Sequence, residues 1–330
     1  MRVTGEADLT ARAVWLSLWG ALMKELPGEL TPDELIARVR AFGSVTELPE
    51  GEAVSQRRTI ARGIMHLVVS QTFSAIRSGR RGRGDADQVA DFYERAYGGQ
   101  HMRLSAETQT RAGRPLPFRV GDRAVVSMAT STCTRFFIDR MSEIVGACEP
   151  MSVCEVGCGR GANLMHLADR LPGVQCTGFD VAEPAIRSAR EFQAMDDLPS
   201  TPFGQSLGLS AERSGSWKSI QFKVGSAFAL PAEDRSFDLV YTSAALEQMQ
   251  SDIARALSEL RRVARHYVLM REPFADGNDM LGRMFLWSKN YFRMRSDELP
   301  KHGLEPVKMW TSLPVKPTFG YSFLLCRVKP

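Results

Sequence analysis

The residues best suited to chemistry lie in one short run, Glu155-Val-Gly-Cys-Gly-Arg-Gly161. An apolar stretch at residues 152–156 leads directly into its glycines, and a helical pattern begins at residue 163. Glycines let a backbone turn sharply and approach a ligand closely, and the first N–H groups of a helix have no partner within that helix. A strand, a glycine turn and a helix in this order predict a cofactor-binding site.

A carboxylate follows about twenty residues later, at the spacing that nucleotide-binding folds use. The next apolar stretch, at residues 175–179, ends in Asp180. The carboxyl ends of neighbouring parallel strands lie on the same side of a sheet, so Asp180 is expected beside the glycine turn. There it would accept hydrogen bonds from both hydroxyls of a ribose. Two cofactors contain such a ribose. They are NAD, whose fingerprint Gly157-x-Gly-x-x-Ala162 formally satisfies, and S-adenosylmethionine.

The surroundings of the turn favour S-adenosylmethionine over NAD. Glu155 stands two residues before Gly157, where its carboxylate would repel a diphosphate and suit a ligand that carries an ammonium and a sulfonium group. The glycines follow a Gly-x-Gly-x-Gly pattern, which suits S-adenosylmethionine because this cofactor has no phosphate to be bound at the turn. An NAD-dependent oxidoreductase remains an alternative, although no Tyr-x-x-x-Lys pair supports it.

Several segments, taken in order, resemble the class I S-adenosylmethionine-dependent methyltransferases with a type 11/25-like domain. Residues 155–161 look like the first motif of that family, and residues 178–182 look like the second. Residues 229–240 are similar to the stretch that joins its third and fourth strands, and residues 244–248 stand where the family often has a short segment ending in His or Glu. The resemblance is strongest over residues 152–271 and weaker towards the C-terminus.

The resemblance implies a role for each residue of a cofactor site. The glycines would pack against the methionine part, Glu155 would lie near its amino group and Asp180 would hold the ribose. Val181 and Ala227 would border the adenine, while Ser243 and Ala244 would form the floor below the sulfonium. Ser226 stands where the family commonly has Asp, so a hydroxyl would have to meet the adenine amino group. The implied cofactor-binding residues are Glu155, Gly157, Cys158, Gly159, Gly161, Asp180, Val181, Ser226, Ala227, Ser243 and Ala244.

No constellation of nucleophile and base stands out in the sequence. Methyl transfer is an in-line displacement at an activated carbon, so positioning and exclusion of water matter most, and an oxygen nucleophile also calls for a general base. The catalytic candidates are Glu247, Arg271 and Glu272, the last two because they end a predicted strand. Cys154 and Cys158 lack a second pair or a nearby His, so we expect reduced thiols and no metal.

The elements that must position these residues alternate between strands and helices. Strands are predicted at 152–156, 175–179, 220–224, 237–241 and 267–271, and helices at 163–170, 184–195 and 251–263. Such alternation indicates an α/β fold with a parallel sheet covered by helices on both faces. The resemblance implies a Rossmann-like, mostly parallel sheet of seven strands, in which residues 303–310 and 319–327 form a C-terminal antiparallel hairpin.

The chain divides into two parts on this basis. Residues 130–330 would form the methyltransferase domain, interrupted by a Ser-, Gly- and Pro-rich segment at about 196–217 that we expect to be a surface insertion. Residues 1–129 would form a mainly helical region that caps the site and sets specificity. Its predicted elements are helices at 8–26, 32–42, 55–76 and 87–97, an arginine- and glycine-rich linker at 77–84 and a strand at 124–128.

Composition limits the class of protein and of partner. The chain has 330 residues, 44% of them hydrophobic and 24% charged, as in globular proteins, and its net charge of +4 gives no argument for nucleic acid. No secretory signal and no apolar run of membrane-spanning length is seen, so a cytoplasmic location is expected. Residues 280–294 are apolar, aromatic and basic, and fit an ordinary helix, a lid or a surface that touches lipid.

These inferences lead to one main hypothesis. The chain is expected to be a transferase that uses S-adenosylmethionine to methylate a small-molecule, sugar or lipid-linked acceptor, with oxygen preferred as the methylated atom on family grounds. The alternative from another class is a non-catalytic protein that binds S-adenosylmethionine in order to sense it or to assemble with a partner. The sequence contains no signal for the identity of the acceptor or for the oligomeric state.

Overall fold

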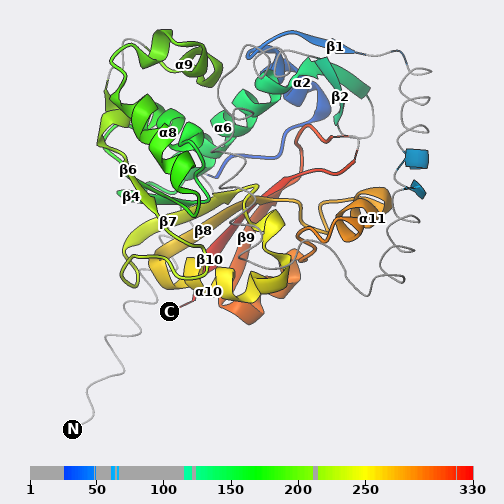
Figure 1. Cartoon of the computed structure of the whole chain (residues 1–330). Coiled ribbons are helices and arrows are strands. Elements are labelled where there is room, and N and C mark those ends of the chain that lie inside the picture. Colours follow the sequence, from blue (N-terminus) through cyan, green and yellow to red (C-terminus); the bar gives the residue numbers. More distant parts are fainter. Residues whose placement is uncertain are drawn as a thin grey trace.

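A seven-stranded sheet forms the centre of the molecule (Figure 1). The computed structural model describes residues 26–47, 49, 61–63, 65–66, 115–120, 124–210, 215–316 and 318–329. The strands of this sheet are β4 (Ser152–Val156), β5 (Gln175–Asp180), β6 (Gln221–Val224), β7 (Phe237–Ser243), β8 (Ala264–Glu272), β9 (Leu304–Trp310) and β10 (Ser322–Val328). Their order across the sheet is β6-β5-β4-β7-β8-β10-β9.

Most of the sheet is parallel, as the sequence predicts. The strands β4 to β8 pair in parallel with their neighbours, whereas β10 is antiparallel to both β8 and β9. The prediction of a mixed α/β fold around a mostly parallel sheet is therefore confirmed. The apolar strands and intervening helices explain it, because a parallel strand needs a crossover long enough for a helix and leaves both of its faces to be covered.

Helices cover the two faces of the sheet. The main ones are α6 (Thr130–Ala147), α7 (Ala162–Arg170), α8 (Glu183–Ala194) and α10 (Ile253–Val263), whereas α11 (Met280–Ser288) packs in a separate small cluster with the segment before β10. Alternate strand residues enter two different hydrophobic clusters, with Val153 packing in the cluster that contains α6 and α7, and its neighbour Cys154 packing in the one that contains α10. This two-residue alternation is the direct consequence of strand geometry. Figure 1 accordingly shows α6 and α10 on opposite sides of the sheet.

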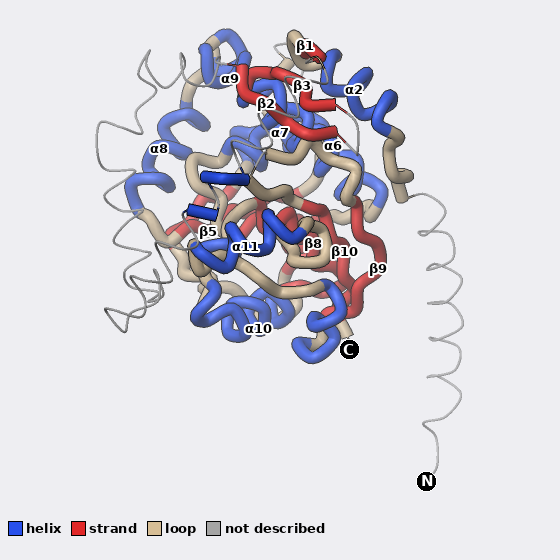
Figure 2. The backbone as a smooth tube through the Cα atoms, turned by 90° about the vertical axis from the view of Figure 1, so that its right-hand side faces the viewer, coloured by secondary structure: helices blue, strands red, loops and turns tan. Residues whose placement is uncertain are grey.

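A second, smaller sheet precedes α6 in the chain. Its antiparallel strands are β1 (Val45–Glu47), β3 (Ala124–Ala129) and β2 (Pro115–Val120), in that order. Only the strand at 124–128 is predicted from the sequence. Figure 2 shows this sheet near α6 and α2 (Pro32–Arg40), both of which contact it.

The helix α2 forms where its start signal predicts it. The amide of Glu34 donates to Thr31 Oγ1 at 3.3 Å and the amide of Thr31 donates to Glu34 Oε2 at 2.8 Å, which is the reciprocal pairing of a capping box. The predicted helices at 8–26, 55–76 and 87–97 and the linker at 77–84 lie outside the described residues, apart from Leu26 and the helical residues 61–63 and 65–66.

The segment between α8 and β6 belongs to the core. It forms a turn at Leu198–Ser200, the helix α9 (Pro202–Leu207) and a further turn at Ser216–Ser219. Leu198, Phe203 and Trp217 are buried, and the ring of Phe203 stacks on that of Phe192 with 4.2 Å between centroids. These side chains make the segment part of the packed interior, which its content of Ser, Gly and Pro did not indicate.

The topology places a ligand site at the carboxyl ends of β4 and β7. The chain runs from β4 outward through β5 to β6 on one side, and then from β7 to β8 on the other side of β4. The connections after β4 and β7 therefore diverge and leave a crevice between them, which is where open α/β sheets bind ligands. No helix in the described part of the chain has the length and apolar character needed to cross a membrane.

The glycine turn ends at Gly161, where the packing leaves no room for a side chain. Gly161 has φ +78° and precedes α7, and a Cβ atom there would lie 2.4 Å from Cζ of the buried Phe222. Gly173 has φ +95°, but a Cβ atom there would meet nothing within 4 Å. The two residues share the backbone strain and differ in the space around them.

We predict that Gly161→Ala destabilises the protein more than Gly173→Ala does. The control substitution should lower the free energy of unfolding by about 1–2 kcal/mol, the cost of a left-handed alanine. Gly161→Ala should add about 1–3 kcal/mol of overpacking to that cost. Urea unfolding of the two variants measures the difference, and equal losses would show that Phe222 moves aside without cost.

Candidate functional site

A cleft opens at the carboxyl ends of β4, β5 and β7. It is lined by Gly157, Asp180, Val181, Gly225, Ala227, Ser243, Ala244, Ala245, Gln248 and Met249. The structure thus brings together Gly157, Asp180, Val181, Ala227, Ser243 and Ala244 from the residues that the sequence predicts for the cofactor. The other predicted residues, Glu155, Cys158, Gly159, Gly161 and Ser226, are not among those that line the cleft.

The carboxylate of Asp180 ties the glycine turn to the end of the neighbouring strand. The amide of Gly159 donates to its Oδ2 at 2.8 Å, and the amide of Ala182 donates to its Oδ1 at 2.9 Å. An ionised carboxylate accepts up to about four hydrogen bonds. Asp180 can therefore fix both loops and still accept hydrogen bonds from a ligand in the cleft that it lines.

The floor of the cleft is built from two backbone segments in close contact. Gly157 has φ +79°, and a Cβ atom there would lie 2.5 Å from the Cβ of Ala245. Ala244, on the facing segment, has φ +57°, a conformation that costs an alanine about 1–3 kcal/mol. The amide of Ala244 donates to the carbonyl oxygen of Arg271 at 2.9 Å, which helps to hold this strained residue in place.

The structure places Glu155 behind the glycine turn and not on the surface of the cleft. The side chain is fully buried, and its oxygens accept hydrogen bonds from Asn163 Nδ2 at 2.6 Å and from the hydroxyl of Tyr241 at 3.0 Å. Burial raises the pKa of Glu155 to about 7, although both hydrogen bonds oppose the rise. The sequence did not indicate Asn163 or Tyr241, because neither position belongs to the recognised motifs.

Cys158 and Ser226 have local structural roles. Cys158 is buried, and burial raises the pKa of its thiol well above the ordinary value, so it is no nucleophile. The hydroxyl of Ser226 accepts from the amide of Phe228 at 3.2 Å and the carbonyl accepts from Ala229 at 3.0 Å. Ser226 thereby closes the turn that presents Ala227 to the cleft.

A charged and aromatic cluster adjoins the cleft at Ser243. Arg271 donates from Nε to Ser243 Oγ at 2.8 Å, and its guanidinium carbon lies 4.8 Å from the ring centroid of Phe137 and 4.6 Å from that of Tyr321. We call Phe137, Ser243, Glu247, Arg271 and Tyr321 the Arg271 cluster. A cation held between two rings is stabilised by both of them.

Glu247 completes this cluster on its polar side. The hydroxyl of Tyr321 donates to Glu247 Oε2 at 2.8 Å, and Gln248 Nε2 donates to Oε1 at 3.3 Å. Burial raises the pKa of Glu247, while these hydrogen bonds and the charge of Arg271 oppose the rise. A carboxylate whose pKa is shifted towards neutrality beside a cleft has the properties of a general base.

Glu272 supports the floor from below. It is fully buried, and its Oε1 accepts hydrogen bonds from the amides of Ala245 and Leu246, both at 3.1 Å. Burial raises the pKa of Glu272 to about 8, and the nearby Glu247 adds to the rise. Of the three catalytic candidates, Glu247 and Arg271 thus lie together beside the cleft, whereas Glu272 holds the turn that forms it.

Aromatic side chains extend from the floor towards α11. The rings of Phe285 and Phe319 stack at 5.5 Å, and those of Phe319 and Tyr321 meet at 5.3 Å. Ala244, which lines the cleft, packs against the same cluster. These aromatic residues come from α11, within the segment 280–294 that the sequence offered as a helix, a lid or a lipid-contacting surface, and from the segment before β10, which the sequence did not connect with a site.

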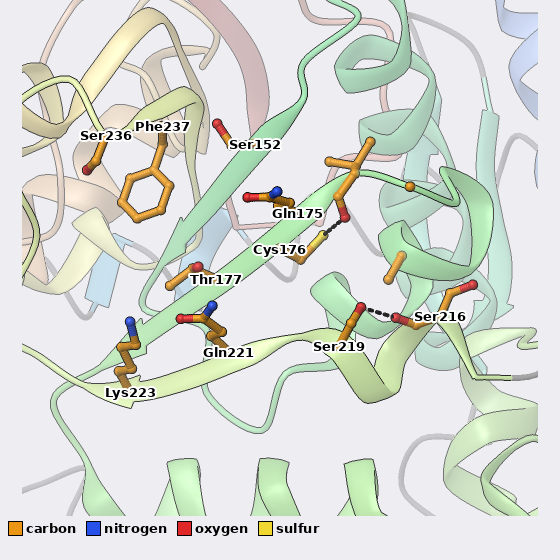
Figure 3. A pocket seen from close by; sticks show the side chains of 13 residues that line it. Ser152, Gln175, Cys176, Thr177, Ser216, Ser219, Gln221, Lys223, Ser236 and Phe237 are labelled. Carbon is orange, nitrogen blue, oxygen red and sulfur yellow. Dashed lines mark hydrogen bonds between the residues drawn. The ribbon is translucent and has the colours of Figure 1, made fainter.

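A second cavity, of about 360 Å³, lies at the amino ends of the strands (Figure 3). Ser152, Gln175, Gln221 and Phe237, which line it, are the first residues of their strands. Several of its polar groups bond to each other or to nearby carbonyls, as Ser219 does to the carbonyl of Ser216 at 2.9 Å. Because ligands in open α/β sheets bind at the carboxyl ends of the strands, we place the functional site in the cleft beside the glycine turn.

Comparison with known proteins agrees with this placement. Residues 154–268 match the model of a family described as a methyltransferase domain. Over 116 residues the chain is 29% identical to norajmaline N-methyltransferase of Rauvolfia serpentina, a match that covers 35% of this chain and 33% of that protein. Over 115 residues it is 32% identical to the malonyl-acyl-carrier-protein O-methyltransferase of Geobacter sulfurreducens, covering 35% of each. The matched part therefore spans about a third of the length of these relatives.

Solved structures were compared as well. Magnesium protoporphyrin IX methyltransferase from Synechocystis, solved with S-adenosylhomocysteine, covers 74% of this chain and 99% of its own, with 14% identity and a TM-score of 0.47. The cyclase SpnF covers 76% of this chain and 99% of its own, with 17% identity and a TM-score of 0.47. Residues 154–268 are thus similar to a methyltransferase domain, both in the family match and in the related methyltransferases.

Proposed function

We propose that the protein transfers a methyl group from S-adenosylmethionine to a small-molecule, sugar or lipid-linked acceptor, at an oxygen atom. The observation that carries the proposal is the carboxylate of Asp180, which lines the cleft and is held there by the amides of Gly159 and Ala182. A fixed carboxylate at the end of the second strand is suited to the two hydroxyls of a ribose. The family match makes S-adenosylmethionine the ligand with that ribose.

The rest of the cleft fits the other parts of the same cofactor. Val181 is 37% exposed, unusually open for an apolar side chain, and together with Ala227 it offers an apolar surface for the adenine. The small residues Gly157, Ser243 and Ala244 leave room for the methionine part and the sulfonium. An exposed valine at the mouth of a cleft is favourable when a flat apolar ligand covers it.

Glu155 acts on the amino group of the cofactor from behind the turn. Its carboxyl is buried and already accepts two hydrogen bonds, so it contributes through its charge. With a pKa of about 7 in the chain without ligand, the carboxyl ionises readily when an ammonium group arrives nearby. This charge distinguishes an ammonium-bearing ligand from a diphosphate.

The chemistry requires little of the protein beyond position and proton removal. S-adenosylmethionine supplies a methyl carbon activated by a positively charged sulfur. Ser243 and Ala244 line the cleft where the acceptor oxygen would lie in line with that carbon, and Glu247 beside them accepts the proton of the acceptor hydroxyl. The hydroxyl of Tyr321 keeps the Glu247 carboxylate in place by donating to Oε2.

Two other functions remain to be separated from this one. A protein that binds S-adenosylmethionine without catalysis would share the cleft, and the base in the Arg271 cluster favours catalysis. The named relatives include an N-methyltransferase and O-methyltransferases. The preference for oxygen rests on Glu247, because a neutral amine nucleophile has no need of a buried base.

Asp180→Ala should weaken binding of S-adenosylmethionine and S-adenosylhomocysteine by at least about tenfold, because two hydrogen bonds to a charged group are lost. Isothermal titration calorimetry with both ligands and with NAD measures the effect. Asp196→Ala is the matched control, since that carboxylate is exposed and pairs with Lys218. Binding of NAD in preference to the sulfur ligands would contradict the proposed cofactor.

Affinity for S-adenosylhomocysteine should rise with pH. Below about pH 7 the buried Glu155 carries a proton in the free protein, which it must release when it faces the ligand's ammonium group. The affinity should therefore increase by about fivefold from pH 6 to pH 7, by about tenfold from pH 6 to pH 8, and level off above pH 8. Glu155→Gln, which keeps the shape and loses the titration, should flatten the profile. A wild-type affinity that does not change with pH would show that the ammonium group of the ligand does not bind near Glu155.

Glu247→Gln should lower kcat for a hydroxyl acceptor by about 100-fold or more, as expected for loss of a general base. The acceptor would first be found by a screen with S-adenosylmethionine labelled in its methyl group. Affinity for S-adenosylhomocysteine should stay within about twofold of the wild type. Glu233→Gln, an exposed carboxylate, is the control. An unchanged kcat would leave Glu247 a purely structural residue.

A further inference from the structure

We infer that the acceptor carries an anionic group, a carboxylate or a phosphate, and that Arg271 and Lys316 bind this group beside the ring of Tyr321. The inference rests on the proposed function, since it assigns the acceptor side of the same site. It goes beyond that function by naming the charge and the chemical class of the acceptor.

Arg271 has unused capacity to bind an anion. Its guanidinium carries five N–H donors in a fixed fork, and among the described residues it makes one hydrogen bond, from Nε to Ser243 Oγ. The centroids of the Phe137 and Tyr321 rings lie 4.8 Å and 4.6 Å from its central carbon, so the two rings restrict where the group can lie. A planar fork with a restricted position and two uncommitted nitrogens is suited to paired oxygens of a carboxylate or a phosphate.

Lys316 brings a second positive charge to the same ring. Its Nζ lies 5.7 Å from the centroid of Tyr321, which also faces Arg271. Both cations act on the buried thiol of Cys133, lowering its pKa against the stronger effect of burial, which raises that pKa to about 12. The two positive charges are therefore directed at one region of the molecule.

No carboxylate of the described residues forms an ion pair with either cation, although both cations lower the pKa of Glu247. The ion pairs found in the described part of the chain involve neither Arg271 nor Lys316. Glu247 lies in the same cluster, but its carboxylate bonds to Tyr321 and Gln248. Arg271 is half-buried and Lys316 is exposed, and an anionic ligand beside the Tyr321 ring would be attracted by both charges.

The anion site is placed for an acceptor and not for the cofactor. The residues proposed to bind the cofactor follow β4, β5 and β6 and reach the end of β7 at Ser243 and Ala244, whereas Arg271 lies near the end of β8, one strand further on. Adjacent strands are about 4.8 Å apart, so β8 lies roughly 10 Å from β4. The methionine carboxylate would have to cross the floor at Ser243 to reach Arg271.

The surroundings describe the rest of the acceptor. Ala244 belongs both to the cleft and to the aromatic cluster formed by Phe285, Tyr291, Phe319 and Tyr321 with Leu286. A molecule anchored by its anionic group at Arg271 would place an apolar or aromatic body against these rings. The predicted acceptor is therefore an amphipathic molecule with an apolar body and a carboxylate or phosphate.

The test uses the whole chain saturated with S-adenosylhomocysteine and three small probes. Benzoate and phenyl phosphate carry the two anions on an aromatic ring, and benzamide is their neutral counterpart. Calorimetric titration should show that one or both anions bind at least about tenfold more tightly than benzamide, as expected for a charged hydrogen-bonded pair. The anion that binds more tightly identifies carboxylate or phosphate as the group.

Variants then locate the binding. Arg271→Gln should lower the affinity for the anion by at least about tenfold. Arg271→Lys should restore part of that affinity, because lysine supplies the charge without the planar pair of guanidinium donors. Lys316 is exposed, so Lys316→Gln should fold normally and weaken the anion by about threefold or more. The matched controls are Lys308→Gln, over the ring of Trp310, and Arg135→Gln, over the ring of Phe42, neither of which should alter binding.

Three results would overturn the inference. The first is that benzamide binds as tightly as the anions. The second is that neither anion binds to protein that does bind S-adenosylhomocysteine. The third is that Arg271→Gln weakens the binding of S-adenosylhomocysteine and leaves the binding of the probes unchanged. The last result would assign Arg271 to the methionine carboxylate and leave the proposed function intact. Failure of the wild-type protein to bind S-adenosylhomocysteine is a separate outcome, which would remove the proposed function itself and the acceptor site with it.

Discussion

The cleft depends on hydrogen bonds that cross from one strand end to the next. A turn with left-handed glycines has many alternative conformations, so it needs acceptors to hold it. These come from the end of β5, where the carbonyl of Phe179 accepts from Gly157 and Cys158, and the carboxylate of Asp180 accepts from Gly159. The pairing of Val156 with Phe179 sets the two strand ends level. The register of the parallel sheet thus decides the geometry of the turn.

What the sequence predicted correctly is local. Apolar runs, glycines and the spacing to Asp180 are all contained in short segments, and the strands, the turn and the position of Asp180 in the cleft follow from them. Glu155 shows where local inference ends. The type of the residue suggested a charge facing the ligand, but its partner Tyr241 lies 86 residues away and removes the carboxylate from the surface. No pattern around Glu155 contains that information.

The acceptor side could be predicted even less. Arg271 was identified by its place at a strand end, yet its aromatic partners Phe137, in α6, and Tyr321, just before β10, lie far apart in the chain. Apolar residues at helical or strand spacing usually form a core, so nothing in the sequence separates an aromatic wall from ordinary packing. The same reasoning applies to Trp217, which is buried in a segment whose composition resembles a surface loop.

The distribution of charge gives the two sides of the cleft different ligands. The carboxylates of Glu155 and Asp180 lie on the side of β4 and β5, and the cations Arg271 and Lys316 lie beyond β7 together with the proposed base Glu247 and the buried Glu272. Between them the end of β7 is small and carries no charge. A cationic cofactor and an anionic acceptor would each be stabilised on its own side and rejected on the other, because buried like charges repel strongly. Methyl transfer then converts a sulfonium into a neutral thioether, so the product is held less firmly by the acidic side than the reactant was. The charge pattern that orients the two substrates would thereby also favour release of the spent cofactor.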